Sequence, residues 1–290
     1  MLILILWIYI FTIGTIFGSF WSVLIERWHS GKSGIIAWKS ECPKCQHKLS
    51  WYELIPIFSY LFLKWKCKNC HMIIHWSYPV LEFTMWMLFF MTYISVWVSY
   101  GWEIWGNFIP QLCFDLLLIF IVVIFSIYDI RYMEIPDQLM ITTILFLFIF
   151  LGIDAFMQVS WIASISSILY EHFQDFSAGS VWNLPLFNAM LWGIWLFLFF
   201  YLQILISNGK WMGWWDLRIA LFLWFTLGAI KTLIATMLAY CIGSIIGLLI
   251  LLKVRRKNIA IPFWPFLAIW WLLTFLFYED ILILYNLLIL

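Results

Sequence analysis

Residues 109–129 read IPQLCFDLLLIFIVVIFSIYD. The run is almost wholly apolar, and about 20 such residues cross the hydrocarbon core of a bilayer as a helix. It ends on an acidic residue, Asp129, where such a helix would leave the membrane. Similar apolar runs fill the 290-residue chain, which is 66% hydrophobic and 11% charged, with a mean hydropathy of +1.00. Soluble domains carry about 25% charged residues. This composition therefore excludes a soluble enzyme, a disordered chain and a basic nucleic-acid binder, and it indicates an all-α polytopic membrane protein.

Eight transmembrane helices are expected from the apolar runs, of which the fourth and sixth are short. The runs cover residues 2–25, 79–100, 109–127, 139–153, 186–206, 217–230, 232–252 and 263–283. The first run is too long for a cleavable signal and lacks a small-residue cleavage site, so we expect an uncleaved anchor. The segment 154–185 is predicted to be an outer insertion with an interfacial helix near 160–173.

The basic residues predict the orientation of these helices. If the N-terminus is outside, the inner segments hold every Lys and Arg except Lys231, which is 15 of the 16 in the chain. Basic residues concentrate in cytoplasmic loops. We therefore expect a multi-pass plasma-membrane protein with both termini outside and residues 26–78 as a cytoplasmic domain. The net charge of +1 provides no general field to recruit an acidic partner.

Four cysteines inside 26–78 form two Cys-x-x-Cys pairs, Cys42 with Cys45 and Cys67 with Cys70, separated by 21 residues. Two such pairs can bring four thiolates onto one tetrahedral Zn²⁺, although this separation is one residue beyond the usual range. Two disulfides are the alternative, but a cytoplasmic location disfavours them. His47 and His71 flank the pairs and are interpreted as bystanders or outer-shell groups. Cys113 and Cys241 lie in apolar runs and are expected to be buried and inert.

Two carboxylates fall at the predicted cytoplasmic ends of apolar runs. Asp129 ends the third run and Asp216 begins the sixth. Two carboxylates held together would share a proton, one acting as general base on water and the other as general acid, as in an aspartyl protease. Alternatively, each is a helix-end residue, with Asp216 as an N-terminal cap favoured by the helix dipole. Asp137 is predicted to cap the fourth helix and is the alternative partner.

The chain resembles the type IV prepilin peptidases, membrane aspartyl proteases with a Gly-x-Gly-Asp motif, along most of its length. The resemblance is carried by Gly18-Ser-Phe20, Ile25-Glu-Arg27, Ser40-Glu-Cys-Pro-Lys-Cys45, Ser50-Trp-Tyr-Glu-Leu-Ile-Pro56, Lys66-Cys-Lys-Asn-Cys70, Tyr78-Pro-Val-Leu-Glu82, Asp129, Ile135-Pro-Asp137, Met212-Gly213, Asp216-Leu-Arg218, Ile261-Pro-Phe263 and Pro265-Phe-Leu-Ala268. No single motif carries it alone. Only 154–185 has no recognised counterpart.

The resemblance implies an endopeptidase that cleaves the leader of type IV pilin or pseudopilin precursors after a Gly at the cytoplasmic membrane face. It implies Asp129 and Asp216 as the catalytic pair, in a peptidase domain of seven helices over 79–290 that follows the first helix (1–25) and the cysteine domain. Many members also N-methylate the new terminus with S-adenosylmethionine, for which no residues are assigned here. A catalytically inactive pilin-assembly factor of the same fold is the alternative. A transporter is less favoured, because Glu82 and Asp115 are the only candidates for mid-membrane ionisable residues.

Tryptophan replaces glycine at several positions of the family pattern, including two in Trp211-Met-Gly-Trp-Trp-Asp216, where the family resembles Gly-Met-Gly-x-Gly-Asp. The positions concerned are Trp38, Trp65, Trp211, Trp215, Trp224, Trp264 and one of Trp270 and Trp271. Glycine serves where φ is positive or where backbones approach closely, and tryptophan would overpack such sites. We hypothesise that UGA codons read as Gly in the natural host are written here as Trp. Divergence in an inactive paralogue is the alternative.

Overall fold

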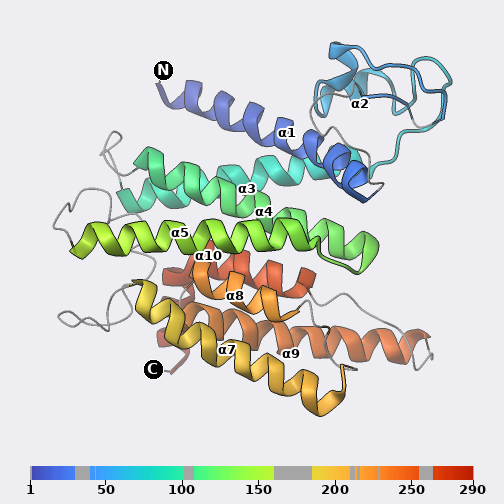
Figure 1. Cartoon of the computed structure of the whole chain (residues 1–290). Coiled ribbons are helices and arrows are strands. Elements are labelled where there is room, and N and C mark those ends of the chain that lie inside the picture. The colour runs from blue at the N-terminus through green and yellow to red at the C-terminus, as the bar shows by residue number, and fades with distance from the viewer. Residues whose placement is uncertain are drawn as a thin grey trace. The chain divides into compact units, whose positions relative to one another are not determined.

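The all-α fold is confirmed by a computed structural model. It describes residues 2–29, 40–42, 44–100, 108–159, 185–209, 213, 216–227, 229–254 and 264–289. Within these ranges the backbone forms helices, turns and two isolated β-bridges beside the cysteines, with no strand. The helices are α1 (Leu2–His29), the 3₁₀ helix η1 (Trp51–Leu54), α2 (Phe58–Phe62), α3 (Ser77–Tyr100), α4 (Ile109–Tyr132), α5 (Asp137–Val159), α7 (Pro185–Ser207), α8 (Asp216–Leu227), α9 (Ala229–Val254) and α10 (Trp264–Ile289) (Figure 1).

Eight long helices fall on the eight expected segments. Four of them, α1, α3, α4 and α9, contain a stretch long and apolar enough to cross a membrane, and the other four contain shorter apolar stretches. Eight crossings therefore stay a prediction. Helix α5 reaches Val159, so it extends six residues into the segment expected to begin at 154. The expected interfacial helix near 160–173 lies outside the described residues.

The chain divides into two compact units, each described by itself. The first contains residues 1–102 together with 112–124 of α4. The second contains residues 103–111 and 125–290, which include the last two turns of α4. The first unit thus holds the cysteine domain, and the second holds all three aspartates of the candidate site.

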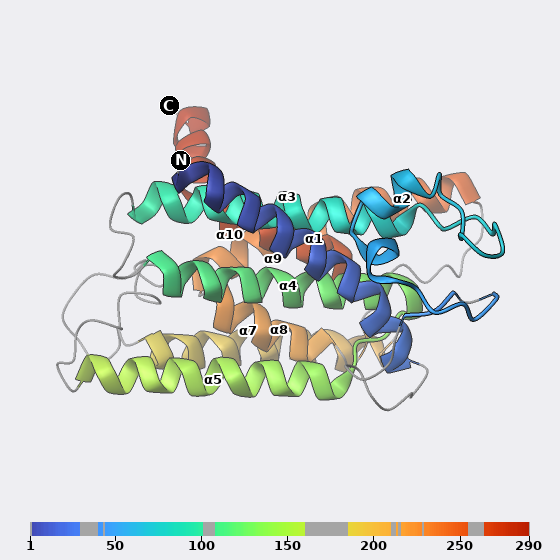
Figure 2. The ribbon, with the colours of Figure 1, turned by 90° about the horizontal axis from the view of Figure 1, so that it is seen from above.

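Close packing of α1 against α3 organises the first unit, as Figures 1 and 2 show. A Cβ placed on Gly14 would lie 2.8 Å from the Cα of Trp86, and one placed on Gly18 would lie 2.5 Å from the Cα of Glu82. Both separations are shorter than real Cβ contacts. Small residues four positions apart allow helices to approach this closely within a membrane, where apolar burial alone does not drive helix association.

Aromatic rings and hydroxyl groups join the helices of the second unit. The ring of Phe125 near the end of α4 lies 5.8 Å from those of Phe222 in α8 and Trp264 in α10. The indole Nε1 of Trp271 donates a hydrogen bond to Thr226 Oγ1 at 2.8 Å. These contacts fix the α8 helix, which is only 12 residues long, against the end of α4 and against α10.

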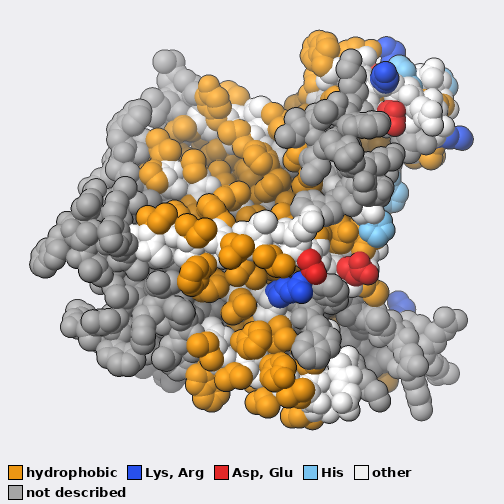
Figure 3. Space-filling model, viewed as in Figure 1, with side chains coloured by type: hydrophobic (Ala, Val, Ile, Leu, Met, Phe, Trp, Pro, Cys, Tyr) orange, Lys and Arg blue, Asp and Glu red, His pale blue; other side chains and the backbone are white. Residues whose placement is uncertain are grey.

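The helices present large apolar side chains outward, as expected for a protein surrounded by lipid. Figure 3 shows hydrophobic side chains over the described surface that faces the viewer. The prediction that Cys113 and Cys241 are buried is wrong, because both are exposed on the outer faces of α4 and α9. A thiol can face lipid as readily as a protein core, so an apolar sequence context did not distinguish the two.

We expect Gly18→Ala to destabilise the α1–α3 pair by about 1–3 kcal/mol, because the added methyl group would meet the α3 backbone. Gly152→Ala in α5 is the matched control. A Cβ there has nothing within 4 Å, and removing a helix glycine is expected to stabilise by roughly 0.5–1 kcal/mol. Unfolding in mixed micelles with increasing dodecyl sulfate measures both changes. Equal effects of the two substitutions would show that the close approach at Gly18 is not required.

Candidate functional site

The two cysteine pairs sit in two turns of the same construction. The Cys42 N–H donates to the carbonyl of His47 at 2.9 Å, and the Cys67 N–H donates to the carbonyl of Met72 at 2.8 Å. The residue after each second cysteine, Gln46 or His71, has a positive φ of 56° or 55°. An isolated β-bridge closes each turn. The short sequences Cys-x-x-Cys thus fold into matching knuckles that turn their sulfur atoms toward one another.

The four sulfur atoms form a cluster that can hold a metal ion. Cys42 Sγ lies 3.8 Å from Cys70 Sγ, Cys45 Sγ lies 4.0 Å from Cys67 Sγ, and all four lie within 4.8 Å of one another. Tetrahedral Zn²⁺ with bonds of about 2.3 Å separates its thiolates by about 3.8 Å. All four cysteines are free, so the geometry corresponds to the metal interpretation rather than to two disulfides. The donor set and its dimensions fit zinc.

Backbone N–H groups directed at the sulfurs favour their charged form. The N–H of His47 lowers the pKa of Cys45 to about 7, and the N–H groups of Cys70 and Asn69 lower the pKa of Cys67. The N–H of Met72 also favours the thiolate of Cys70, but burial and the neighbouring sulfurs raise its pKa to about 11. Four adjacent thiolates repel one another unless a cation lies between them, and a bound metal provides that cation.

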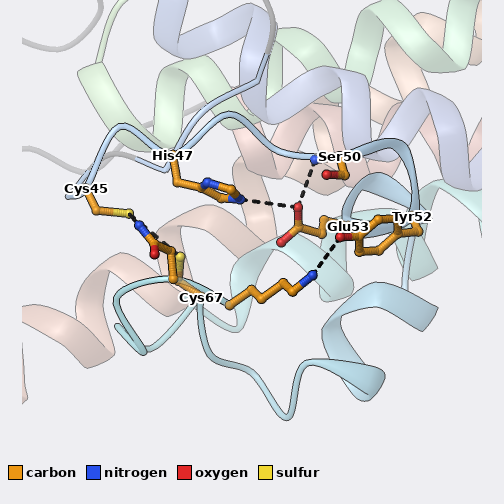
Figure 4. Close-up of polar contacts among 8 residues, drawn as sticks. Cys45, His47, Ser50, Tyr52, Glu53 and Cys67 are labelled. Carbon is orange, nitrogen blue, oxygen red and sulfur yellow. Dashed lines mark hydrogen bonds and ion pairs between the residues drawn. The ribbon is translucent and has the colours of Figure 1, made fainter.

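Glu53 is a buried carboxylate behind the first knuckle (Figure 4). The backbone N–H of Ser50 donates to Glu53 Oε2 at 2.8 Å, which completes a capping box at the start of η1. His47 Nε2 lies 3.6 Å from the same oxygen. The N–H of Ser50 is the main cause that lowers the pKa of Glu53, and burial opposes it. The hydroxyl of Ser50 and then the charges of His47 and Lys68 lower the pKa further. The imidazole of His47 therefore faces Glu53, while its backbone N–H is directed at Cys45, which corresponds to the outer role predicted for this residue.

Glu82 in α3 is a second buried carboxylate whose role the residues alone did not reveal. Its Oε2 accepts a hydrogen bond of 2.6 Å from the backbone N–H of Ile57, the residue that precedes α2. This bond ties the cysteine domain to the membrane-spanning helix. The pattern Ser-x-x-Glu at 50–53 is a capping-box signal that could have identified Glu53. No comparable sequence pattern identifies the partner of Glu82, because Ile57 lies 25 residues away in the sequence.

The three aspartates of the candidate site lie at helix ends in the second unit. Asp129 is in the last turn of α4 and is 8% exposed. Asp216 is the first residue of α8, as predicted, and its side chain lies outside the described residues, as do Trp211, Trp214 and Trp215. Asp137, predicted to cap the fourth helix, is the first residue of α5, directly after Pro136, whose carbonyl accepts a hydrogen bond from the N–H of Met140.

An ion pair joins the helices that begin at Asp137 and Asp216. Asp137 at the start of α5 accepts a hydrogen bond from Arg218 in the first turn of α8. The two side chains are 45% and 35% exposed, so the pair lies at a polar boundary rather than in the core. Asp137 is thus engaged with the positive side chain two residues beyond Asp216, a contact that the sequence did not predict.

Metal removal is expected to loosen the cysteine domain, because a segment this polar derives much of its folding free energy from the metal. A strong chelator should release one Zn²⁺ per chain and make Cys42, Cys45, Cys67 and Cys70 reactive toward an alkylating reagent. Cys113 and Cys241 are the internal control, because their reactivity in the same micelles should not change. Metal analysis without zinc, or mapping of a Cys42–Cys45 disulfide under non-reducing conditions, would contradict this expectation.

Glu53→Gln tests the buried carboxylate through pH. Because its pKa is lowered by folding, the Glu53 carboxylate stabilises the folded protein at pH values above 4.5, the ordinary pKa of a glutamate. This contribution is lost as the pH falls through the lower pKa of the folded state. We therefore expect the variant to be less stable than wild type near pH 7, with the difference shrinking as the solution is acidified. Because acid also protonates the cysteines of both proteins, the difference between them is the quantity to measure, by denaturant titration. A difference that does not change with pH would show that the charge of Glu53 has no role.

Comparisons with known proteins agree with this architecture. Residues 12–96 match the family model described as the bacterial peptidase A24 N-terminal domain. Three proteins named prepilin leader peptidase/N-methyltransferase are similar to the chain: from Bacillus subtilis (30% identical, 95% of this chain and 96% of the relative), Aeromonas salmonicida (26%, 80% and 68%) and Myxococcus xanthus (40%, 29% and 24%). No solved structure matches the chain. The near-complete match to the Bacillus relative shows that this chain belongs to the prepilin leader peptidase/N-methyltransferase family.

Proposed function

We propose that this protein is a membrane aspartyl endopeptidase that removes the leader of type IV pilin or pseudopilin precursors, with Asp129 and Asp216 as its catalytic pair. Its relatives are named as leader peptidases, which supports the reaction class. The composition and the apolar helices support a membrane setting. By the distribution of Lys and Arg, the reaction takes place at the cytoplasmic face of the plasma membrane.

The contact between Asp137 and Arg218 is the observation that carries the assignment of the pair. It joins Asp137, which lies eight residues after Asp129, to Arg218, which lies two residues after Asp216. The contact between Phe125 and Phe222 supports the same arrangement. Asp129 lies four residues beyond Phe125, and Asp216 lies six residues before Phe222. At 1.5 Å per helical residue these intervals are about 6 and 9 Å, so the two aspartates lie at similar levels if α4 and α8 run in opposite directions.

The chemistry of such a pair follows from its shared proton. Two adjacent carboxylates cannot both ionise cheaply, so one is protonated and the other is charged, and the pair titrates as a unit. The charged carboxylate removes a proton from water, whose oxygen attacks the scissile carbonyl carbon. The protonated carboxyl group then provides a proton as the C–N bond breaks and the amine leaves. Asp129 is 8% exposed, so it has the restricted contact with solvent that a paired carboxylate needs.

The substrate explains why the pair lies at helix ends. A pilin-like precursor carries a basic leader followed by an apolar helix. The leader is attracted to anionic headgroups, and the apolar helix lies in the bilayer. The scissile bond between them is then at the depth of the last turn of α4 and the first turn of α8.

Two cofactors belong to this proposal. Zn²⁺ bound by Cys42, Cys45, Cys67 and Cys70 has a structural role, because four protein thiolates leave no open position for a reacting water. S-adenosylmethionine would supply the methyl group for N-methylation of the new terminus, a second activity that the names of the relatives imply.

The reading of several tryptophans as natural glycines is part of the same proposal. Trp65 has a positive φ of 53°, which glycine adopts freely and a bulky residue adopts rarely. Trp264 is 1% exposed, and its Nε1 has no hydrogen-bond partner among the described residues. By contrast, the Nε1 of Trp271 is hydrogen-bonded, as expected of a genuine buried tryptophan. Trp38, Trp211 and Trp215 lie outside the described residues, and only the backbone of Trp224 is described.

We expect Asp129→Asn and Asp216→Asn each to abolish leader cleavage, because asparagine retains the shape of aspartate but cannot exchange a proton. The double variant should be no worse than either single one, since residues that act as a unit are not additive. Cleavage of a pilin precursor by purified protein in proteoliposomes provides the measurement. The assay uses the chain with glycine at the replaced positions, after the intact mass of the native protein has established which tryptophans are glycine.

Asp137→Asn is the matched control, because it changes a carboxylate of the same cluster that is engaged with Arg218. It should retain most of the activity and lose at most about 0.5–2 kcal/mol of stability, the value of a helix cap, with the lower end expected because asparagine caps a helix as well as aspartate and the ion pair is partly exposed. Cleavage by the Asp216→Asn protein would show that the aspartyl mechanism is wrong. An inert chain with both aspartates and the glycines in place would favour the non-catalytic assembly factor.

A further inference from the structure

We propose that residues 51–62 of the cysteine domain, the 51–62 segment, insert into the bilayer beside α1 and α3, so that a lipid surface is the partner of this face of the domain. The segment contains η1, α2 and the turn between them. All of these elements belong to the first unit of the chain. The inference does not depend on the peptidase activity.

The depth of the 51–62 segment is the first argument. The ring of Phe58 lies 6.3 Å from that of Phe11 in α1, which lies 5.4 Å from that of Trp86 in α3. Trp86 is nine residues from the start of the candidate span Ser77–Val98, which places it about 13 Å along the helix axis. A hydrocarbon core is about 30 Å thick. Phe58 therefore reaches the level of apolar side chains well inside the span.

The backbone of the segment is already satisfied by the protein at this depth. Glu82 accepts the N–H of Ile57, and the N–H groups of Ser59 and Leu61 bond to the carbonyls of Ile55 and Ile57. Irregular backbone is tolerated in a membrane only when the protein satisfies its polar groups. The otherwise costly carboxylate in α3 thus supplies the acceptor for a turn that the proposed insertion would remove from water.

The outward side chains of the segment are those that lipid favours. Trp51, Leu61 and Phe62 are 77%, 59% and 81% exposed. Between the segment and α1 lies a groove of about 360 Å³ with largely apolar walls, lined among others by Phe11, Ile16, Trp51 and Phe58. The exposed apolar surface of α1 therefore continues onto the segment, and the two threonines in the groove, Thr12 and Thr15, donate their hydroxyl groups to carbonyls of α1 itself. Tryptophan at such a boundary is typical of membrane interfaces.

Charge supports lipid rather than a soluble protein as the occupant. Residues 40–76 contain five lysines and two glutamates, a net charge of +3. Lys64 and Lys66 directly follow α2 and are exposed. Lysines beside inserted aromatic side chains are attracted to anionic headgroups.

The test places a fluorescent amino acid, acridonylalanine, at Phe62 in the full chain and at Lys48 in a control chain. Lys48 is an exposed residue of the same domain, on the first knuckle. Both proteins are reconstituted into nanodiscs of phosphatidylcholine and phosphatidylglycerol. The lipids carry a nitroxide quencher either in the headgroup or along the acyl chain. A third protein carries the fluorophore at Leu61, which guards against a local defect at position 62.

We expect acyl-chain nitroxides to quench the probe at positions 62 and 61 several-fold more than the probe at position 48. Equal quenching at all three positions would overturn the proposal. Weak lipid quenching at 61 and 62, combined with a spectral shift on addition of an apolar helical peptide, would also overturn it and assign the face to a protein ligand. Cleavage of a precursor in the same nanodiscs is measured separately, so that failure of the insertion and failure of the peptidase assignment are distinguishable.

Discussion

An ionisable group in an apolar protein must be given its partners by the protein itself, and this constraint accounts for much of the structure. Glu82 in α3 is the clearest case, because its carboxylate accepts the N–H of Ile57 across 25 residues of sequence. Gly18 permits that geometry, since the α1 backbone lies directly against the Cα of Glu82. The close packing at Gly18 and the hydrogen bond that satisfies the Glu82 carboxylate therefore depend on the same approach of α1 to α3. This arrangement attaches the cysteine domain to α1 and α3.

Much of the fold could be predicted from the sequence, because the relevant physics is local. Length and hydropathy placed eight helices at the expected segments, and Cys-x-x-Cys spacing predicted the sulfur cluster. Helix ends were less predictable. Helix α5 continues to Val159, since apolar content drops at residue 154 while the backbone still prefers a helix. Hydropathy identifies the apolar residues of a chain. The length of a helix also depends on where its backbone hydrogen bonds end, and this is harder to predict from the sequence.

The candidate site was only partly predictable, because its decisive contacts join distant segments. The aspartates at the ends of α4, α5 and α8 could be found as charged residues beside apolar runs. The pairing of Asp137 with Arg218 could not, since it spans 81 positions and depends on how α5 and α8 pack. The same applies to the contact between Phe125 and Phe222. Exposure of Cys113 was predicted wrongly for a related reason, because apolar residues in a membrane protein face either lipid or protein.

In the proposed mechanism, the placement of carboxylates at helix ends would serve a balance that peptide hydrolysis requires. A carboxylate deep in the bilayer would be held neutral and would lack water, while a fully solvated one would not share a proton with its neighbour. The last turn of α4 meets both needs, because Asp129 is 8% exposed yet lies only three residues from the end of the helix. Asp216 opens α8, where the helix dipole favours a negative charge. The two carboxylates thus come from opposite kinds of helix end, one from the last turn of α4 and one from the first residue of α8.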